Sequence, residues 1–86
     1  MDFVVYILYS SSRDKFYIGQ TNNLCRRFAE HNSGLSVSTK SGRPWELFAC
    51  KNCETRSEAV HLETKLKSFK NKEYLKKFIR ESGFKI

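Results

Sequence analysis

The sequence predicts a single α+β domain in which three helices flank a small three-stranded antiparallel sheet. Two short runs of alternating apolar residues near the N-terminus are joined by four polar residues, and a third apolar and aromatic run lies near the middle of the chain. Three further segments repeat apolar residues at helical spacing, each after a residue that favours a helix start. The 86 residues suffice for one small core, so we expect one domain over residues 1–86.

The first two strands are predicted at Phe3–Ser10 and Lys15–Gln20, paired as an antiparallel hairpin. Strand side chains alternate between the two faces of a sheet, so Tyr17 and Gly19 share one face of the second strand. Tyr6 can lie on the same face of the first strand. We therefore expect two phenols side by side, with space left by the glycine for a substrate that brings a phosphate close to backbone.

A helix is predicted after the hairpin, begun by Asn22 or Asn23 and running to about Asn32, with Gly34 just beyond its end. Within it, Leu24 and Phe28 are four residues apart and should anchor the helix to the sheet.

Arg27 and His31 share the neighbouring stripe of this helix and can reach a cleft at the sheet edge. Arg26 is turned away from Arg27 by about 100°. Arg27 is therefore the arginine expected to face the cleft.

A loop rich in serine, threonine and glycine follows over residues 33–44, and its hydroxyls and cations could contact phosphates. The third strand is predicted at Trp45–Lys51. Thr55 and Glu58 have the spacing of a capping box and open a second helix, whose buried face comprises Ala59, Leu62, Leu66 and Phe69. Asn71 is expected to cap a last helix with Tyr74, Leu75, Phe78 and Ile79 as its apolar residues.

The positive charge of the chain is concentrated at its C-terminal end. The whole chain has a net charge of +7, and residues 65–86 carry eight basic and two acidic residues, a balance of +6. A basic surface attracts polyanions, of which nucleic acid is the commonest. A solvated lysine-rich face that serves solubility is the alternative explanation.

The cysteines and the absence of a hydrophobic segment indicate the surroundings of the protein. No apolar run approaches the roughly 20 residues of a membrane helix, and the first residues lack the features of a signal peptide. We expect a cytoplasmic protein with no membrane partner. The odd number of cysteines, three, argues against a disulfide framework. Cys50 and Cys53 have half the spacing of a zinc site, which leaves a zinc scaffold or protein-interaction domain as a minor alternative.

The order of several motifs resembles the GIY-YIG nucleases, and the short standalone bacterial members most of all. Val4-Val5-Tyr6 lacks the leading glycine of the first family motif, whereas Tyr17-Ile18-Gly19 matches the second in full. The likeness continues through Arg27, His31 and the segment Thr39 to Trp45, and it ends at Glu63. It implies a divalent-metal-dependent endonuclease that hydrolyses phosphodiester bonds in nucleic acid, with DNA in repair or recombination as the expected substrate.

The resemblance also implies roles for individual residues. Glu63 would hold one Mg²⁺ or Mn²⁺ ion, and Arg27 would stabilise charge on the phosphate. Tyr6 or Tyr17 would deprotonate the attacking water, with Tyr6 preferred, provided that Arg27 or the metal lowers the pKa of the phenol. His31 would orient water or donate to the phosphate. Contacts with nucleic acid are expected from Gly19, Thr39, Lys40, Arg43, Lys67 and Lys70.

Simpler structural roles remain open for the same residues. Glu63 and Lys67 have the spacing of an exposed ion pair on a helix, and His31 could cap the last turn of its helix. The tyrosines could be ordinary strand aromatics. A noncatalytic nucleic-acid-binding module on the same fold is therefore the alternative function. The sequence names neither the substrate structure nor the choice of DNA over RNA, and a partner protein for targeting is also open.

Overall fold

The computed structural model describes residues 3–35 and 39–85 and confirms the predicted fold class. The strands are β1 (Phe3–Ser10), β2 (Lys15–Thr21) and β3 (Trp45–Cys53). The helices are α1 (Leu24–Ser33), α2 (Arg56–Lys67) and α3 (Lys72–Glu81), with a short 3-10 turn at Lys40–Gly42. The turn lies in the segment expected as a loop, of which residues 36–38 lie outside the described part.

The sheet has the strand order β2-β1-β3, and both pairs are antiparallel. Tyr6 is paired with Gly19, and Leu8 is paired with Tyr17. Directly paired residues share a face, so the prediction that both phenols lie on one face is confirmed. β2 is an edge strand, which brings Tyr17 and Gly19 to one side of the sheet.

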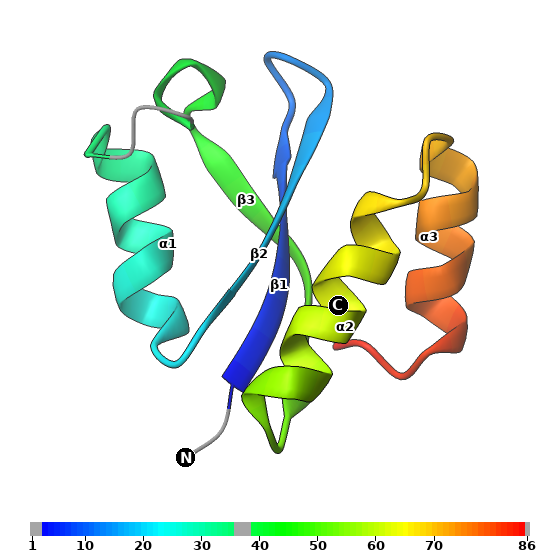
Figure 1. Cartoon of the computed structure of the whole chain (residues 1–86). Coiled ribbons are helices and arrows are strands. Elements are labelled where there is room, and N and C mark those ends of the chain that lie inside the picture. Colours follow the sequence, from blue (N-terminus) through cyan, green and yellow to red (C-terminus); the bar gives the residue numbers. More distant parts are fainter. Residues whose placement is uncertain (1–2, 36–38, 86) are drawn as a thin grey trace.

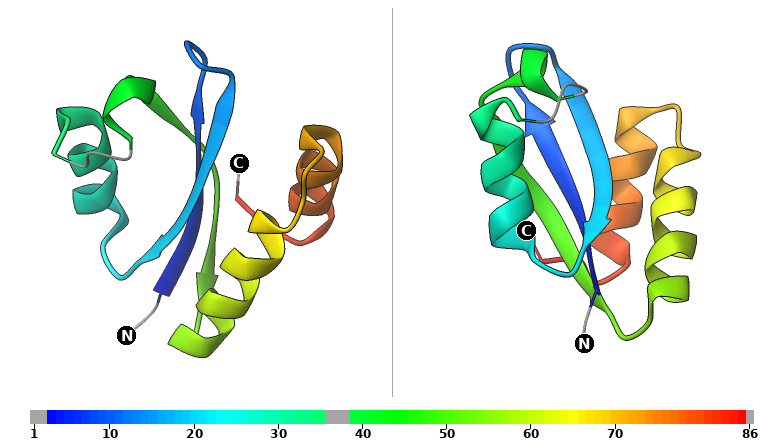
Figure 2. Two further views of the ribbon diagram at one scale, coloured as in Figure 1. Left: turned by 45° about the horizontal axis from the view of Figure 1, so that its top comes forward. Right: turned by 60° about the vertical axis from the view of Figure 1, so that its left-hand side comes forward.

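The helices are divided between the two faces of the sheet. Figure 1 and both views of Figure 2 show α1 on one face and the pair α2 and α3 on the other. The apolar side chains form two separate clusters accordingly. One contains Val5 and Ile7 of β1 with residues from α2 and α3, and the other contains Tyr6, Leu8 and Trp45 with partly buried residues of α1.

The helix starts agree with the capping residues in the sequence. The Asn23 side chain accepts a hydrogen bond from the backbone N–H of Arg26 at 3.1 Å, and Thr55 does the same for Glu58 at 3.1 Å. Asn71 caps α3. Gly34 ends α1 at a φ of 85°, a left-handed conformation that glycine adopts without the steric cost of a Cβ.

Two boundaries and one orientation differ from the predictions. β3 continues past Lys51 to Cys53, because Asn52 and Cys53 pair with β1 even though the apolar pattern has ended. β2 includes one further residue, Thr21. Tyr74, expected among the apolar residues of α3, is 65% exposed.

The arrangement of Cys50 and Cys53 argues against a shared zinc ion. They lie three residues apart on one strand, and Cys50 packs with the Tyr6 cluster while Cys53 packs with the Val5 cluster. Their side chains therefore point to opposite faces of the sheet. Within residues 3–35 and 39–85, no helix has the length and apolar character to cross a membrane.

Candidate active site

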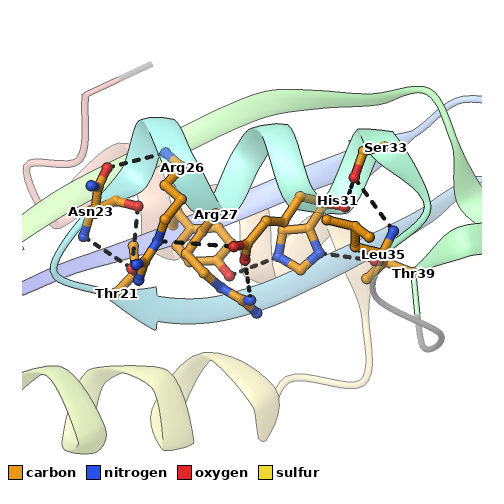
Figure 3. A network of polar contacts seen from close by, with 10 residues as sticks. Thr21, Asn23, Arg26, Arg27, His31, Ser33, Leu35 and Thr39 are labelled. Carbon is orange, nitrogen blue, oxygen red and sulfur yellow. Dashed lines mark hydrogen bonds and ion pairs between the residues drawn. The ribbon is translucent and has the colours of Figure 1, made fainter.

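The predicted catalytic residues come from four elements and gather along the edge strand β2. Tyr6 comes from the central strand, Tyr17 from β2, and Arg27 and His31 from α1. Figure 3 shows Arg27 and His31 on the side of α1 that faces β2. Glu63 comes from α2, on the opposite face of the sheet, and its carboxylate interacts electrostatically with Tyr6. The two layers therefore meet at the sheet edge that β2 forms.

A buried chain of hydrogen bonds fixes the Tyr6 phenol. Its hydroxyl lies 2.9 Å from Nε2 of His31, and Nδ1 of the same ring lies 2.9 Å from Oγ1 of Thr39. The carbonyl of Thr39 accepts a hydrogen bond from the indole N–H of Trp45 at 2.7 Å. Tyr6, His31 and Thr39 are almost completely inaccessible to solvent, with Tyr6 only 1% exposed. A buried network with satisfied partners holds its side chains in one orientation.

His31 has a role that neither sequence-based alternative described. It lies in the last turn of α1, but both ring nitrogens contact side chains, Tyr6 and Thr39, and not the helix carbonyls. Burial, with a contribution from Arg27, lowers its pKa below the ordinary value. The imidazole is therefore neutral at pH 7, and one of its nitrogens accepts a hydrogen bond while the other donates.

Tyr6 does not have the lowered pKa that a simple phenolate base requires. Burial raises the pKa of its phenol, and the neighbouring Tyr17 raises it further. Arg27 lowers the pKa, but its effect is smaller than the combined rise. The ring centroids of the two tyrosines are 6.3 Å apart, and that of Tyr17 is 4.8 Å from that of His31. Tyr6 therefore stays protonated at neutral pH and would need an acceptor for its proton.

Arg26 and Arg27 differ in solvent exposure, as the helical spacing predicts. The Arg27 side chain is 33% exposed and that of Arg26 is 63% exposed. Arg27 donates to Glu30 at 2.7 Å, and this hydrogen bond, with a contribution from Tyr6, raises the pKa of the guanidinium. Arg26 reaches the same carboxylate only at 3.9 Å. Arg27 is thus the cation held next to the phenol.

Glu63 combines the two interpretations that the sequence allowed. Its Oε2 accepts a hydrogen bond from Lys67 at 2.8 Å, so the helix ion pair does form. Its side chain is nevertheless only 20% exposed, compared with 55% for Lys67. An exposed surface pair would leave both groups in solvent. The carboxylate instead borders the site, and its charge contributes to the raised pKa of Tyr6.

Gly19 and Thr39 have roles other than the phosphate contacts expected of them. A Cβ at Gly19 would lie 2.6 Å from the Tyr6 hydroxyl, so the missing side chain makes room for this phenol and not for a substrate. Thr39 is 0% exposed, and its hydroxyl contacts His31. Both residues therefore support the buried chain from inside the protein.

Comparison with known proteins agrees with this geometry. Residues 2–77 match the GIY-YIG catalytic domain. The chain belongs to the GIY-YIG family. The UPF0213 protein lin0209 of Listeria innocua is 41% identical over 75 residues, which cover 83% of each chain. The UPF0213 protein lmo0166 of Listeria monocytogenes is 41% identical over 62 residues, covering 71% of this chain and 69% of the relative.

A solved relative has the same fold. The solution NMR structure of the UPF0213 protein BH0048 from Bacillus halodurans superimposes with a TM-score of 0.59 at 27% sequence identity. The match covers 96% of this chain and 88% of that one. The three-stranded sheet with three helices is therefore the GIY-YIG fold of the UPF0213 proteins.

The remaining basic residues of the GIY-YIG domain that were expected to bind nucleic acid form two groups. Lys40 and Arg43 are exposed beyond the C-terminal end of α1, and Nε of Arg43 donates to the Lys40 carbonyl at 3.0 Å. Lys67 and Lys70 are exposed at and after the end of α2. The first group follows α1 and the second follows α2, and these helices lie on opposite faces of the sheet (Figure 1).

Four charged residues near the GIY-YIG site received no role from the sequence. Glu30 holds Arg27, and Arg56 joins Arg27 in lining a hollow of about 340 Å³. Arg13 and Lys15 line a second hollow, of about 230 Å³, with Tyr17 and Trp45. The chain has 16 basic and 9 acidic residues, so only the folded arrangement separates these four from the rest.

The donor set of the GIY-YIG site limits the kind of metal that fits. Among the described residues, no three histidine, cysteine, aspartate or glutamate side chains are grouped so as to hold an ion. Of the two carboxylates at the site, Glu30 is held by Arg27 and Glu63 is paired with Lys67 through one oxygen. A single carboxylate fits Mg²⁺, which keeps several waters and takes oxygens from a bound phosphate, better than it fits a metal held by protein alone.

Proposed function

We propose that this chain is a divalent-metal-dependent endonuclease that hydrolyses phosphodiester bonds in nucleic acid, with DNA as the expected substrate. The observation that carries the proposal is the buried series of hydrogen bonds from Tyr6 through His31 to Thr39, with Arg27 beside the phenol. A buried tyrosine hydroxyl needs one hydrogen-bond partner, and here that partner is a neutral imidazole that can accept the phenol proton and is itself held by Thr39. The match to a catalytic domain over residues 2–77 supports the same activity.

His31 would supply the proton acceptor that Tyr6 needs. In the tautomer with its proton on Nδ1, the imidazole donates to Thr39 and accepts the Tyr6 O–H at Nε2. When the phenol oxygen takes a proton from the attacking water, its own proton passes to Nε2. The water oxygen then bonds to phosphorus and the bond to the leaving oxygen breaks. A base with a raised pKa can act in this way because it never has to exist as a free phenolate.

Arg27 and Tyr17 would bind the phosphate beside Tyr6. The planar guanidinium offers paired donors to the non-bridging oxygens, on which negative charge grows in the transition state. Its hydrogen bond to Glu30 fixes the direction of the side chain. Lys67 has a half-exposed flexible stem, so its ammonium can exchange the Glu63 carboxylate for a phosphate oxygen.

Glu63 is the residue that would hold one Mg²⁺ or Mn²⁺ ion at this site. Bound there, the ion supplies Lewis-acid stabilisation of the leaving oxygen. The Glu63 carboxylate belongs to α2, on the face of the sheet opposite to α1 and Arg27. The two residues would therefore contact one phosphate from two directions.

The test is cleavage of labelled duplex, single-stranded, flap and branched DNA, and of RNA, with Mg²⁺ or Mn²⁺ and with chelator. We expect metal-dependent cleavage by the parent and a loss of about 100-fold or more in Glu63→Gln, while binding persists. Glu81→Gln, which removes an exposed carboxylate far along α3, is the matched control and should cut like the parent. If Glu63→Gln also cuts like the parent, or if the parent cuts nothing, the noncatalytic binding module replaces the proposal.

A further inference from the structure

A cleft of about 380 Å³ lies beside the candidate active site. It runs between the edge strand β2 on one side and the end of α2 with the start of α3 on the other. Phe16, Leu66 and Phe69 give it an apolar and aromatic lining. Both phenylalanines are only partly buried. Its size falls within the roughly 300–1,000 Å³ of small-molecule pockets.

Four lysines surround this apolar lining: Lys15, Lys67, Lys70 and Lys72. Lys72 forms an ion pair with Asp14 at 2.8 Å and so ties the hairpin turn to α3 at one end of the cleft. Lys67 is paired with Glu63. Within the described part of the chain, Lys15 and Lys70 form no salt bridge. The rim is therefore cationic, and an anionic ligand would be attracted to it.

The cleft and the candidate active site adjoin at Tyr17 and Lys67. Tyr17 lines the cleft, and its ring also lies 4.8 Å from the ring of His31, measured between centroids. Lys67 lines the cleft and contacts Glu63. A nucleic acid whose phosphate lies between Arg27 and Glu63 would thus have its neighbouring nucleotide at the mouth of the cleft.

We propose that this cleft holds one unpaired nucleobase of the substrate, next to the phosphodiester bond that is cut. The inference rests on the proposed function and adds the substrate class: nucleic acid with unpaired nucleotides, such as single strands, bulges or flaps. Aromatic rings stack on bases of any sequence, and lysines around them contact the flanking phosphates. A fully paired duplex keeps its bases stacked inside and leaves the apolar lining unfilled.

The experiment compares two DNA duplexes that differ in one position. The first carries a single unpaired thymidine, and the second carries an abasic residue at the same place, which keeps the phosphate and removes the base. Affinity is measured at one fixed salt concentration in chelator, so that neither probe is cut. We expect the parent to bind the thymidine probe about 5-fold or more tightly than the abasic probe.

Substitutions in the cleft test whether the unpaired base binds there. Phe69→Leu and Phe16→Leu each keep an apolar side chain but lose an aromatic face, and each should reduce the preference for thymidine to within about 2-fold. Phe84→Leu is the matched control, because Phe84 belongs to the same core but does not line the cleft. It should keep the parent's preference. Thermal unfolding of each variant checks that it is folded.

Three results would overturn the inference. They are equal affinity of the parent for the two probes, a full preference retained by both cleft variants, and no binding of the parent to either probe. The binding test is independent of catalysis, so the two proposals can fail separately. Cleavage without a base preference would remove the cleft assignment alone, and a base preference without cleavage would remove the nuclease assignment alone.

Discussion

Replacing Gly19 by alanine tests whether the space beside Tyr6 is required to hold the phenol against His31. The added Cβ would lie 2.6 Å from the Tyr6 hydroxyl and 2.8 Å from Cζ of its ring. Ordinary contacts to a Cβ begin at 3.4 Å, so the hydroxyl and the Cβ must separate by about 0.8 Å. The phenol is buried on the central strand, and it can yield only by moving away from its hydrogen bond or by shifting the strands.

The expected cost follows from this displacement. Overpacking a tight core destabilises by about 1–3 kcal/mol, and each kcal/mol lowers the Tm of a domain this size by about 4–8 °C. Displacement of a catalytic group by about 1 Å can reduce the rate about 100-fold. We therefore expect Gly19→Ala to remain folded at 25 °C, to melt several degrees lower and to lose most of its cleavage activity.

The same substitution in a Tyr6→Phe background provides the control. Phenylalanine lacks the oxygen that makes the closest contact, and its ring is not tied to His31, so part of the cost in stability should disappear. The assay is chemical denaturation of the parent, the two single variants and the double variant, combined with single-turnover cleavage. A stability cost for Gly19→Ala that is equal in both backgrounds, or a Gly19→Ala variant as active as the parent, would show that the space at Gly19 does not hold the phenol in place.

Three further predictions concern pH, charge and cysteine. His31 has a folded-state pKa below the unfolded value, so the unfolded chain binds more protons and stability should fall as the pH drops below about 6.5; His31→Gln should weaken this pH dependence of the denaturation midpoint. Lys15→Gln with Lys70→Gln should weaken nucleic-acid binding and flatten the slope of log affinity against log salt by about two phosphate contacts. Cys50→Ala with Cys53→Ala should preserve metal-dependent cleavage, measured beside thermal unfolding and zinc content.

Each of these predictions has its own control and its own contrary result. His61→Gln removes an exposed histidine, and an equal change in pH dependence there would contradict the role of burial at His31. Lys77→Gln with Arg80→Gln removes two exposed charges of α3 that do not line the cleft. An equal fall in affinity in this variant would mean that nucleic acid responds to the total charge and not to the lysines of the cleft. Stoichiometric zinc in the parent, lost together with folding in the cysteine variant, would contradict the third prediction.

The parts of the fold that depend on local sequence were predictable. The alternation of Phe3–Ser10 and Lys15–Gln20 placed Tyr6 and Tyr17 on one face, because the period of a strand is fixed by its backbone. Helix starts followed from side chains such as Asn23 and Thr55 that cap their own backbone. The separation of Arg27 from Arg26 followed from the 3.6-residue turn.

The parts that depend on packing between distant elements were not predictable. Nothing in the spacing of Thr39 and His31 indicates that one hydroxyl meets the second ring nitrogen, since this contact depends on the path of the connecting segment. The role of Gly19 depends on the rotamer of Tyr6 on the next strand. The cleft exists only because β2 and the end of α2 lie a certain distance apart, and the sequence does not give this distance. Roles in catalysis for Tyr6, Tyr17, Arg27, His31 and Glu63 stay predictions.

If the phenol beside Arg27 belongs to a site for phosphodiester cleavage, the two adjacent arginines of α1 should differ sharply in their effect on the rate. Arg27→Ala and Arg26→Ala remove the same charge from consecutive residues of α1, and both arginines contact Glu30. The measurement is the single-turnover rate of metal-dependent DNA cleavage at saturating enzyme. We predict a loss of about 100-fold or more for Arg27→Ala and a change within about threefold for Arg26→Ala. Equal rates in the two variants would contradict the account.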